Sequence, residues 1–492
     1  MSQSETAADR VKARPLVFGL QTDRPLKSND RPFRERGWQM ICSNSNRPLL
    51  GSSALCPRVI EGTRLTIMKN MKEDAPEVKR ELPFGSPSPQ SSRIALPALM
   101  LCAWAFWAPN ARALGLRVPN QDASAIARGN AFVATADNPS AIYYNPAGIT
   151  QLEGEHIQAG SLFYLGIYGD YQSPTGSSLH NDPALIAAPT LQYTISPEDL
   201  PLSFGFGIYE PFGLSMKWPD NAPFRQEGLE ASLTYITMNP VVAWKVLTSL
   251  SIAAGPTFNY SQLDVVQGLF PSPNILPGDQ AKFKGEDWSY GFNLGMLWQP
   301  HPQWSFGASY RSSSRMNYQG NFTLQPSPPL QPGSTATSST LDFPQIAIGG
   351  ISFRPTPKWN IEFDLDWADW NSVNSLAIQG VSNRPLDWHS TFMYEIGVTR
   401  SFDNGYYLSA GYFFSPASTS TQFFTPLDPD TDLHVGSVGG GYKGHHWDWA
   451  LAFQLIAGGW RSVTVDPAIS STVNGQYRLL TPTLSFTVGY HF

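Results

Sequence analysis

Apolar and polar residues alternate with a period of two in one segment after another of the chain that follows Ala113. In 484–492, even positions are apolar and odd positions are small or polar, and segments 290–298, 359–367 and 447–455 are similar. No apolar run of even fifteen residues occurs there, so no membrane-spanning helix is predicted. Because side chains of a strand point alternately to opposite faces, the pattern restricts this part of the chain to β-sheet.

Both a soluble β-sandwich and a membrane β-barrel fit such alternation. Two features favour the barrel: acids, Asn and Gly occupy the second face, and aromatic residues gather at the ends of the apolar face. We therefore predict an all-β fold, a fourteen-stranded antiparallel transmembrane β-barrel, in which short turns alternate with long loops. The candidate strands are 156–168, 187–196, 202–215, 231–246, 250–263, 284–299, 303–318, 341–354, 358–370, 388–401, 405–415, 432–443, 446–457 and 478–492.

The charges and cysteines divide the chain into two parts. Residues 1–113 hold 17 Lys/Arg and 10 Asp/Glu, a net charge of +7, whereas residues 114–492 hold 16 and 29, a net charge of −13. All three cysteines lie in the first part, which excludes a disulfide framework or a cysteine-bound metal from the second. An acidic body without a basic stripe also argues against nucleic acid as a partner.

A secretory signal occupies residues 93–113. Arg93 precedes the apolar run 94–108, and Ala111-Arg112-Ala113 forms an A-x-A cleavage pattern, so the exported chain is predicted to begin at Leu114. Residues 1–92 are polar and lack periodicity, which predicts disorder. They are either an extension from an over-extended reading frame or a functional pro-segment.

The segment 136–150, "ADNPSAIYYNPAGIT", is broken twice by Asn-Pro pairs. Together with "LGLRVPNQDASAIARGNAFVAT" before it, and with "GFGIYEPFGLSMKWP" and "PLDPDTDLHVGSVGGGY" later, it resembles the FadL (OmpP1/FadL/TodX) family of outer-membrane transporters. The resemblance implies that residues 114–154 form a plug inside a barrel made by 155–492. The plug residues it singles out are Tyr143, Tyr144, Asn145, Pro146, Ala147 and Gly148.

The third candidate strand contains Pro211 and Gly213 within a regular run. Proline removes a ladder hydrogen bond, so Pro211 marks a break or bulge, or else the start of a loop. In the family this strand is kinked, which implies a gap in the wall through which a hydrophobic cargo can leave sideways. We expect the plug backbone and the Asn145 amide to cover that gap, so that plug and break work as one gate.

A fatty-acid cargo would need a cationic partner for its carboxylate. In 310–317, Arg311 and Arg315 fall on one face opposite Tyr310, and at the rise of a strand they lie about 13 Å apart. We expect both to face the lumen, where they either bind the cargo or pair with acids such as Asp364. Lys217 and Arg225 are weaker candidates for this role. Because acids outnumber bases in the exported chain, a neutral hydrophobic cargo such as an aromatic hydrocarbon or alkane is an alternative.

The resemblance implies uptake of long-chain fatty acids or other hydrophobic compounds across the outer membrane of a Gram-negative cell. Transport would be passive, ligand-gated diffusion. Two alternatives are an outer-membrane lipase or acyltransferase barrel and a general diffusion porin. We expect no catalytic residue, cofactor or metal: alternating Asp428, Asp430 and Asp432 do not make an EF-hand, because Pro429 intervenes and the downstream Gly and Glu are missing. The expected partners are hydrophobic small molecules, outer-membrane lipids and the barrel-assembly machinery, which would recognise the last strand, ending in Phe492. We expect the protein to be a monomer.

Overall fold

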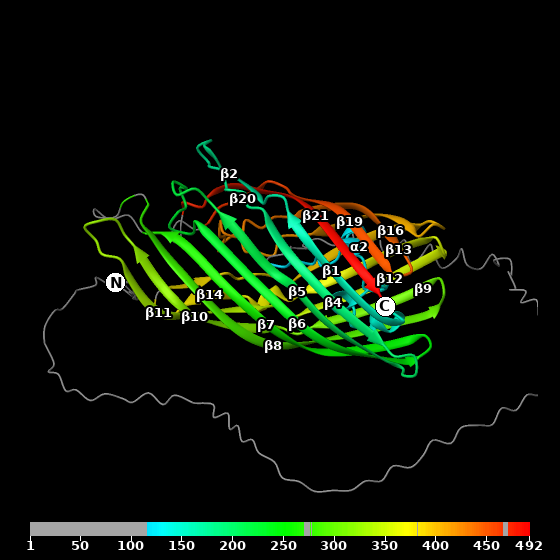
Figure 1. Cartoon of the computed structure of the whole chain (residues 1–492). Coiled ribbons are helices and arrows are strands. Elements are labelled where there is room, and N and C mark those ends of the chain that lie inside the picture. The colour runs from blue at the N-terminus through cyan, green and yellow to red at the C-terminus, as the bar shows by residue number, and fades with distance from the viewer. Residues whose placement is uncertain (1–115, 270–275, 277, 381, 466–470) are drawn as a thin grey trace, which may run out of the picture. The chain divides into compact units, whose positions relative to one another are not determined.

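The computed structural model describes residues 116–269, 276, 278–380, 382–465 and 471–492 (Figure 1). All of these fall within one compact unit, Pro87–Phe492. The predicted N-terminal extension, the signal peptide and the start at Leu114 lie outside the described residues.

Fourteen antiparallel strands close into a ring, which confirms the predicted barrel. The ring closes where the first wall strand pairs with the last, from His156 opposite His491 to Tyr164 opposite Thr483. Each predicted segment corresponds to one wall strand. In order around the ring the strands are β1 (Gly154–Tyr164), β4 (Ile186–Ser196), β5 (Leu202–Lys217), β6 (Glu230–Leu247), β7 (Leu250–Gly268), β8 (Gln280–His301), β9 (Trp304–Arg311), β12 (Ile346–Thr356), β13 (Trp359–Ala368), β16 (Thr391–Ser401), β17 (Tyr406–Ser415), β18 (Leu433–Lys443), β19 (Trp447–Gly458) and β21 (Gly475–His491).

Seven further strands extend this wall, and those labelled in Figure 1 lie towards the end opposite the C-terminus. Residues 319–340, which fall between two of the candidate strands, belong largely to the hairpin of β10 and β11, because β8 continues past β9 and offers its free edge to β10 over 280–286. The seven strands are β2 (Tyr168–Gln172), β3 (Ser178–His180), β10 (Ser314–Gln325), β11 (Gly333–Phe343), β14 (Ser375–Ile378), β15 (Ser382–Pro385) and β20 (Arg461–Val463).

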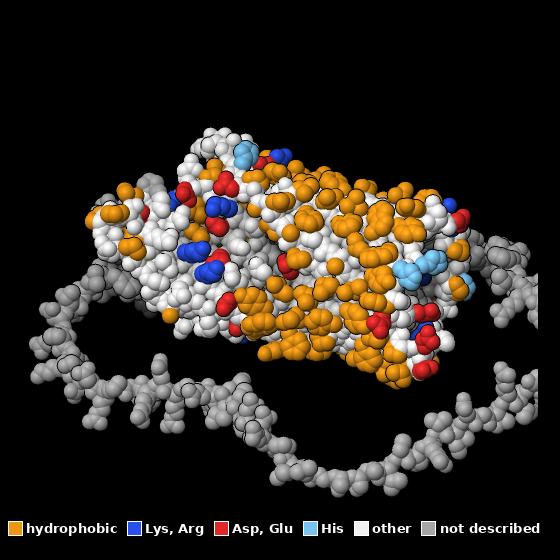
Figure 2. Space-filling model, viewed as in Figure 1, with side chains coloured by type: hydrophobic (Ala, Val, Ile, Leu, Met, Phe, Trp, Pro, Cys, Tyr) orange, Lys and Arg blue, Asp and Glu red, His pale blue; other side chains and the backbone are white. Residues whose placement is uncertain are grey.

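The alternation seen in the sequence sets the two faces of the wall. Along β19, Trp449, Leu451 and Phe453 are exposed while Ala450 and Gln454 are buried, so the apolar side chains point outward. Figure 2 shows outward hydrophobic side chains as a broad band over the wall, with Lys, Arg, Asp and Glu mostly on either side of it, towards the two ends. An apolar outer face suits contact with lipid, and the polar residues then face inward. None of the helices in the described part of the chain is long and apolar enough to cross a membrane.

Residues 116–153, which we call the N-terminal segment, pack against the inward side of the wall. They contain α2 (Ala123–Ala127), α3 (Ala141–Tyr144) and the 3-10 helix η1 (Pro146–Gln151). Asp122 caps α2 by accepting a hydrogen bond from the backbone N–H of Ala125. Wall glycines permit the close approach: a Cβ at Gly397 or Gly411 would lie 2.2 or 2.0 Å from the Arg128 backbone. No larger residue would fit at either glycine without moving the segment.

Candidate functional site

Strand β5 leaves its neighbour β4 halfway along the wall. The two strands pair only from Leu191 opposite Ile208 to Ile195 opposite Phe204, so residues 186–190 of β4 have no partner in β5. On its other side β5 carries a bulge at Glu210 and Pro211, and then pairs with β6 as far as Lys217. Pro211 therefore lies within a continuing strand, and the alternative that it begins a loop is wrong. We call the opening between 186–190 and 209–217 the β4–β5 gap.

Backbone groups of the N-terminal segment pair with β5 at this gap. Val118 N–H donates to the Pro211 carbonyl, and Gly213 N–H donates to the Leu116 carbonyl, both at 2.9 Å. The Gln121 side chain donates to the Glu210 carbonyl at 2.7 Å and accepts from the Glu210 N–H at 3.2 Å. An unpaired backbone group in hydrocarbon costs several kcal/mol, so residues 116–118, the gap strip, satisfy an edge that β4 leaves open.

A second contact of the N-terminal segment is made through acids of β13. One Asp364 oxygen accepts the N–H groups of Phe132 and Val133, at 2.7 and 2.8 Å. Glu362 likewise accepts the N–H groups of residues 134 and 135, at 2.7 and 3.1 Å. Two arginines of the segment pair with the same strand: Arg128 lies 3.3 Å from Glu362, and Arg117 lies 2.5 Å from Asp366. The inward acids predicted from alternation thus bind the segment's backbone.

The Asn145 amide lies at β8 and not at the gap, so that prediction is wrong. Its Nδ2 donates to the carbonyls of Val133 at 2.8 Å and Met296 at 2.9 Å, while its Oδ1 accepts from Ala147 N–H. The Cα of Gly295 leaves room for it, since a Cβ there would lie 2.5 Å from the Asn145 Oδ1. Asn145 therefore caps η1 and ties it to the wall.

The neighbouring plug candidates are buried around this cap. Pro146 opens η1, where its missing N–H leaves no hydrogen bond unmade. Gly148 packs on Ala136, whose carbonyl oxygen would lie 2.3 Å from a Cβ at this position. Tyr143 and Tyr144 pack edge to face, with ring centroids 4.9 Å apart, and Tyr144 OH accepts from Gln121 N–H at 3.0 Å.

Of the two predicted head-group arginines, the structure places only Arg311 inside the barrel. Its guanidinium lies 4.4 Å from the centre of the Tyr143 ring and 5.2 Å from that of Tyr209, and Nη2 donates to the Tyr143 carbonyl at 3.3 Å. Among the described residues, no carboxylate lies within ion-pair distance of Arg311.

Arg315 is on the outer face, so its predicted lumen position is wrong. The strand breaks at Ser312 and Ser313, and inward positions change from odd numbers in β9 to even numbers in β10, where Met316 and Tyr318 are buried. Arg315 instead pairs with Asp342, with Nε 2.5 Å from Oδ1. A shift of one residue in a strand exchanges its two faces.

Lys217 and Arg225 lie at the loop end of the wall. Lys217 is exposed and pairs with Glu230 at 3.1 Å. Arg225 donates to the backbone carbonyls of Asp220 and Asp279, both at 3.0 Å. Neither belongs to the described residues that line the cavities below.

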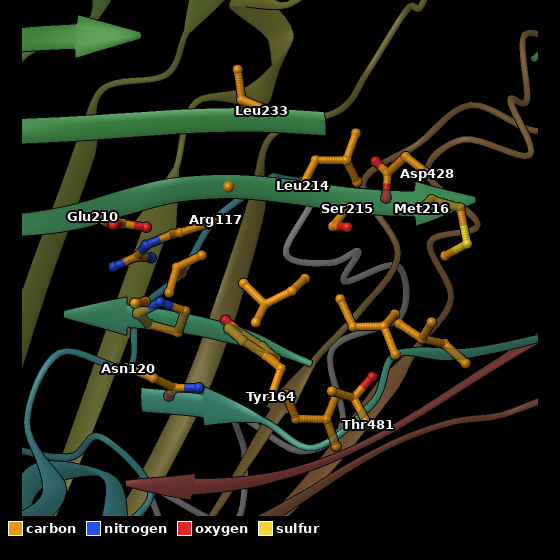
Figure 3. Close-up of a pocket in the computed structure, with 18 of the residues that line it drawn as sticks. Arg117, Asn120, Tyr164, Glu210, Leu214, Ser215, Met216, Leu233, Asp428 and Thr481 are labelled. Atoms are coloured by element: carbon orange, nitrogen blue, oxygen red, sulfur yellow. The ribbon is translucent and has the colours of Figure 1, made fainter. Parts of the chain in front are cut away.

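A cavity of about 320 Å³ lies beside the β4–β5 gap, and a smaller one of about 100 Å³ shares Leu214, Leu233 and Asp428 with it. In Figure 3, Arg117 and Glu210 lie at one end of the larger cavity and Asp428 lies near the other. Sequence reasoning did not single out Arg117 or Asp428 as lining residues. The only signal was that both stand in stretches that resemble the family. The apolar lining includes Tyr164, Ile167, Ile186, Ala187, Ala188, Leu214, Met216, Leu233, Phe413, Leu433, Ile456 and Leu479.

Comparisons with known proteins agree with this geometry. Residues 104–456 match the family model of the outer membrane protein transport proteins (OMPP1/FadL/TodX). The long-chain fatty acid transport protein of Escherichia coli O6:H1 is 23% identical over 343 residues, which cover 61% of this chain and 76% of that protein.

Two solved structures share the fold. A Pseudomonas aeruginosa FadL homologue superposes with a TM-score of 0.68 at 18% identity, covering 77% of this chain and all of that one. The toluene transporter TodX of P. putida superposes with a TM-score of 0.61 at 15% identity, covering 78% of this chain and 99% of that one. The family match spans most of the barrel and the N-terminal segment; the chain belongs to the OMPP1/FadL/TodX family and is a transport protein of the outer membrane.

Proposed function

We propose that this protein takes up hydrophobic compounds by passive, ligand-gated diffusion and releases them sideways into the bilayer through the β4–β5 gap. The observation that carries the proposal is the position of the larger cavity. Both edges of the gap line it, residues 186–188 from β4 and 213–216 from β5. The names of two similar proteins, a long-chain fatty acid transport protein and a toluene transporter, support a hydrophobic cargo.

Lateral release follows from the energetics of apolar surface. Returning buried apolar surface to water costs roughly 25 cal/mol per Å². A molecule that passes from the cavity directly into lipid avoids that cost. The β4–β5 gap is the stretch of wall, within the described residues, where the larger cavity meets strands that are not hydrogen-bonded to each other.

The gap strip is the proposed gate. It is held to β5 by two backbone hydrogen bonds, and Arg117 and Val118 also line the cavity, so a cargo molecule would touch the strip directly. The N-terminal segment would act as the plug, and residues 132–135, bound to β13, would keep the rest of it in place while the strip moves.

A reversible cross-link tests the gate. A Cβ at Gly213 would lie 3.5 Å from Val118 Cγ2, so Val118→Cys with Gly213→Cys places two thiols within reach of a disulfide. Residues 114–492 contain no other cysteine. We expect oxidation to block uptake of a radiolabelled alkane or fatty acid into cells, and reduction to restore it. Each single-cysteine variant is the control. Full uptake by protein whose thiols are shown to be oxidised would contradict lateral release at this gap.

The class of cargo is a separate question. Mass spectrometry of a lipid extract from the purified protein would distinguish fatty acids from neutral hydrocarbons. Arg311 remains the inward arginine proposed for a carboxylate, although it lies against two tyrosine rings. We further infer that the protein performs no catalytic step, in contrast to a lipase or acyltransferase barrel. Lipid extracts incubated with purified protein should therefore show no new hydrolysis or transacylation product.

Assembly is proposed to depend on the last strand. β21 forms the seam of the ring with β1, and Phe492 follows it with its side chain exposed. We propose that the barrel-assembly machinery recognises this strand and that the protein works as a monomer. Deletion of Phe492 should lower the amount of heat-modifiable barrel in the outer membrane, and crosslinking in cells should yield a single-chain species.

A further inference from the structure

Asp428 is a buried acid at the junction of the two cavities. It lies in the loop 416–432 between β17 and β18, and only 9% of its surface is exposed. It lines both cavities, and Figure 3 shows it on the side where Leu214, Ser215 and Met216 also line the larger one. Its Oδ2 has no hydrogen-bond partner among the described residues. A buried acceptor left without a donor is unfavourable by roughly 1–3 kcal/mol.

Two charged side chains of this region, Asp430 and Arg461, make hydrogen bonds to backbone groups of the loop. Asp430, in the same loop, accepts the N–H groups of Ser418 and Thr419, at 2.7 and 3.2 Å. Arg461 donates to the Thr419 and Asp430 carbonyls, at 2.8 and 2.7 Å. Burial, reinforced by the charge of Asp430 and opposed by that of Arg461, raises the pKa of Asp428 well above its ordinary value. The loop thus holds an acid that its own neighbours leave unsatisfied.

The other charged groups that line the cavities do not favour an anion. Arg117 is matched by Asp366, and the Glu210 side chain makes no ion pair with a described residue. In the smaller cavity Arg384 is 3.1 Å from the Glu227 carboxylate and also donates to the Glu227 carbonyl. Each arginine that lines a cavity is therefore within ion-pair distance of a carboxylate, whereas Asp428 and Glu210 make no ion pair with a described residue.

We propose that Asp428 is a selectivity residue, which accepts a hydrogen bond from an amine or hydroxyl head group on an otherwise apolar cargo molecule. This inference rests on the proposed function and narrows it. A cargo with an N–H or O–H donor would satisfy Oδ2 while its apolar body lies along Leu214, Met216 and Leu233. A carboxylate cargo has no N–H or O–H donor to offer to Oδ2.

A matched set of probes tests the inference with the whole exported chain in lipid nanodiscs. Propylbenzene, 3-phenylpropanol, 3-phenylpropylamine and 3-phenylpropanoate share one apolar body and differ in head group. We expect the alcohol and the amine to bind more tightly than the other two. Asp428→Leu should weaken alcohol and amine binding by roughly tenfold, the worth of about one hydrogen bond, and leave propylbenzene binding unchanged. Asp403→Asn, at an exposed acid paired with Lys358, is the matched control.

Asp428→Asn distinguishes the amine from the alcohol probe, because the variant keeps an acceptor oxygen but cannot carry a negative charge. Retained alcohol binding with lost amine binding would identify an ionic contact, whereas loss of neither would identify a neutral hydrogen bond. Equal loss of all four probes in Asp428→Leu would overturn the inference, because it would mean altered cavity shape. Unchanged affinity of Asp428→Leu for every probe would overturn it too. In both cases the disulfide experiment at residues 118 and 213 still decides the gate, so the two proposals fail separately.

Discussion

The N-terminal segment is bound to the wall in two places by different chemistry. At β13, Glu362 and Asp364 accept the four backbone N–H groups of residues 132–135, and Arg128 pairs with Glu362. The side chain of Arg117, in the gap strip, also reaches this strand and pairs with Asp366. At β5, the gap strip makes two backbone hydrogen bonds between neutral groups. The backbone of residues 132–135 thus makes four hydrogen bonds with side chains of β13, whereas the backbone of the gap strip makes two with β5, and the proposed gate would open at the second contact.

The β13 acids should give the largest effect. Asp364→Ala with Glu362→Ala leaves four buried N–H groups without acceptors, at about 1–3 kcal/mol each, so the segment should detach from the wall. We expect ion leakage through the barrel in planar bilayers, with heat-modifiable gel mobility preserved. Asp342→Ala, an outer-face acid, is the matched control. A double variant as tightly sealed as the wild type would show that β13 is not the anchor.

The loop 416–432 lies outside the membrane-spanning strands and contains a similar contact, in which the Asp430 carboxylate accepts the backbone N–H groups of Ser418 and Thr419. Burial raises the pKa of Asp430 to about 6. Because the folded loop holds this proton more tightly than an unfolded one, the stabilisation it gives is complete below about pH 4 and is lost as the pH rises through about 6. The free energy of unfolding of the loop should fall by about 3 kcal/mol over this range. Protease cleavage of the loop should be faster at pH 7.5 than at pH 5. Asp430→Asn should flatten this dependence, and the opposite slope would contradict it.

Closing the β4–β5 gap should affect uptake but not folding. Pro211→Val restores a backbone donor, and Gly213→Ala fits, since a Cβ there makes ordinary contacts with Val118. The 211 carbonyl and the 213 N–H would exchange their bonds with the gap strip for bonds with β4. The restored N–H of residue 211 would add one ladder hydrogen bond, about 1 kcal/mol, and favour a sealed wall by roughly fivefold. Uptake of hydrophobic cargo should fall accordingly while the barrel remains heat-modifiable. If uptake by this folded variant is undiminished, cargo leaves by another route.

Arg311 should give the smallest effect of the four. Arg311→Gln removes a cation over two tyrosine rings, worth about 0.5–2 kcal/mol, and should weaken fatty-acid binding if the carboxylate reaches it. Arg315→Gln, on the outer face, is its matched control and should change binding little. Equal loss of fatty acid and alkane in Arg311→Gln would point to loosened packing around Tyr143 and not to a head-group contact.

Periodicity along the chain was enough to predict the wall. The fourteen segments, the inward side chains of Glu362, Asp364 and Asp366, and the break at Pro211 are all local properties, because a strand's two faces and its missing donors are encoded in consecutive residues. The family was likewise apparent from short motifs in the N-terminal segment.

Only the tertiary structure decided which surfaces meet inside the barrel. Arg315 faces outward because a break at two serines shifts the strand by one residue, and Asn145 lies at β8 because the segment folds across the lumen. The larger cavity draws its lining from the N-terminal segment, from many wall strands and from the loop that carries Asp428. Such juxtapositions depend on strand register and ring closure between residues hundreds of positions apart, and the alternation within a single strand carries no information about them.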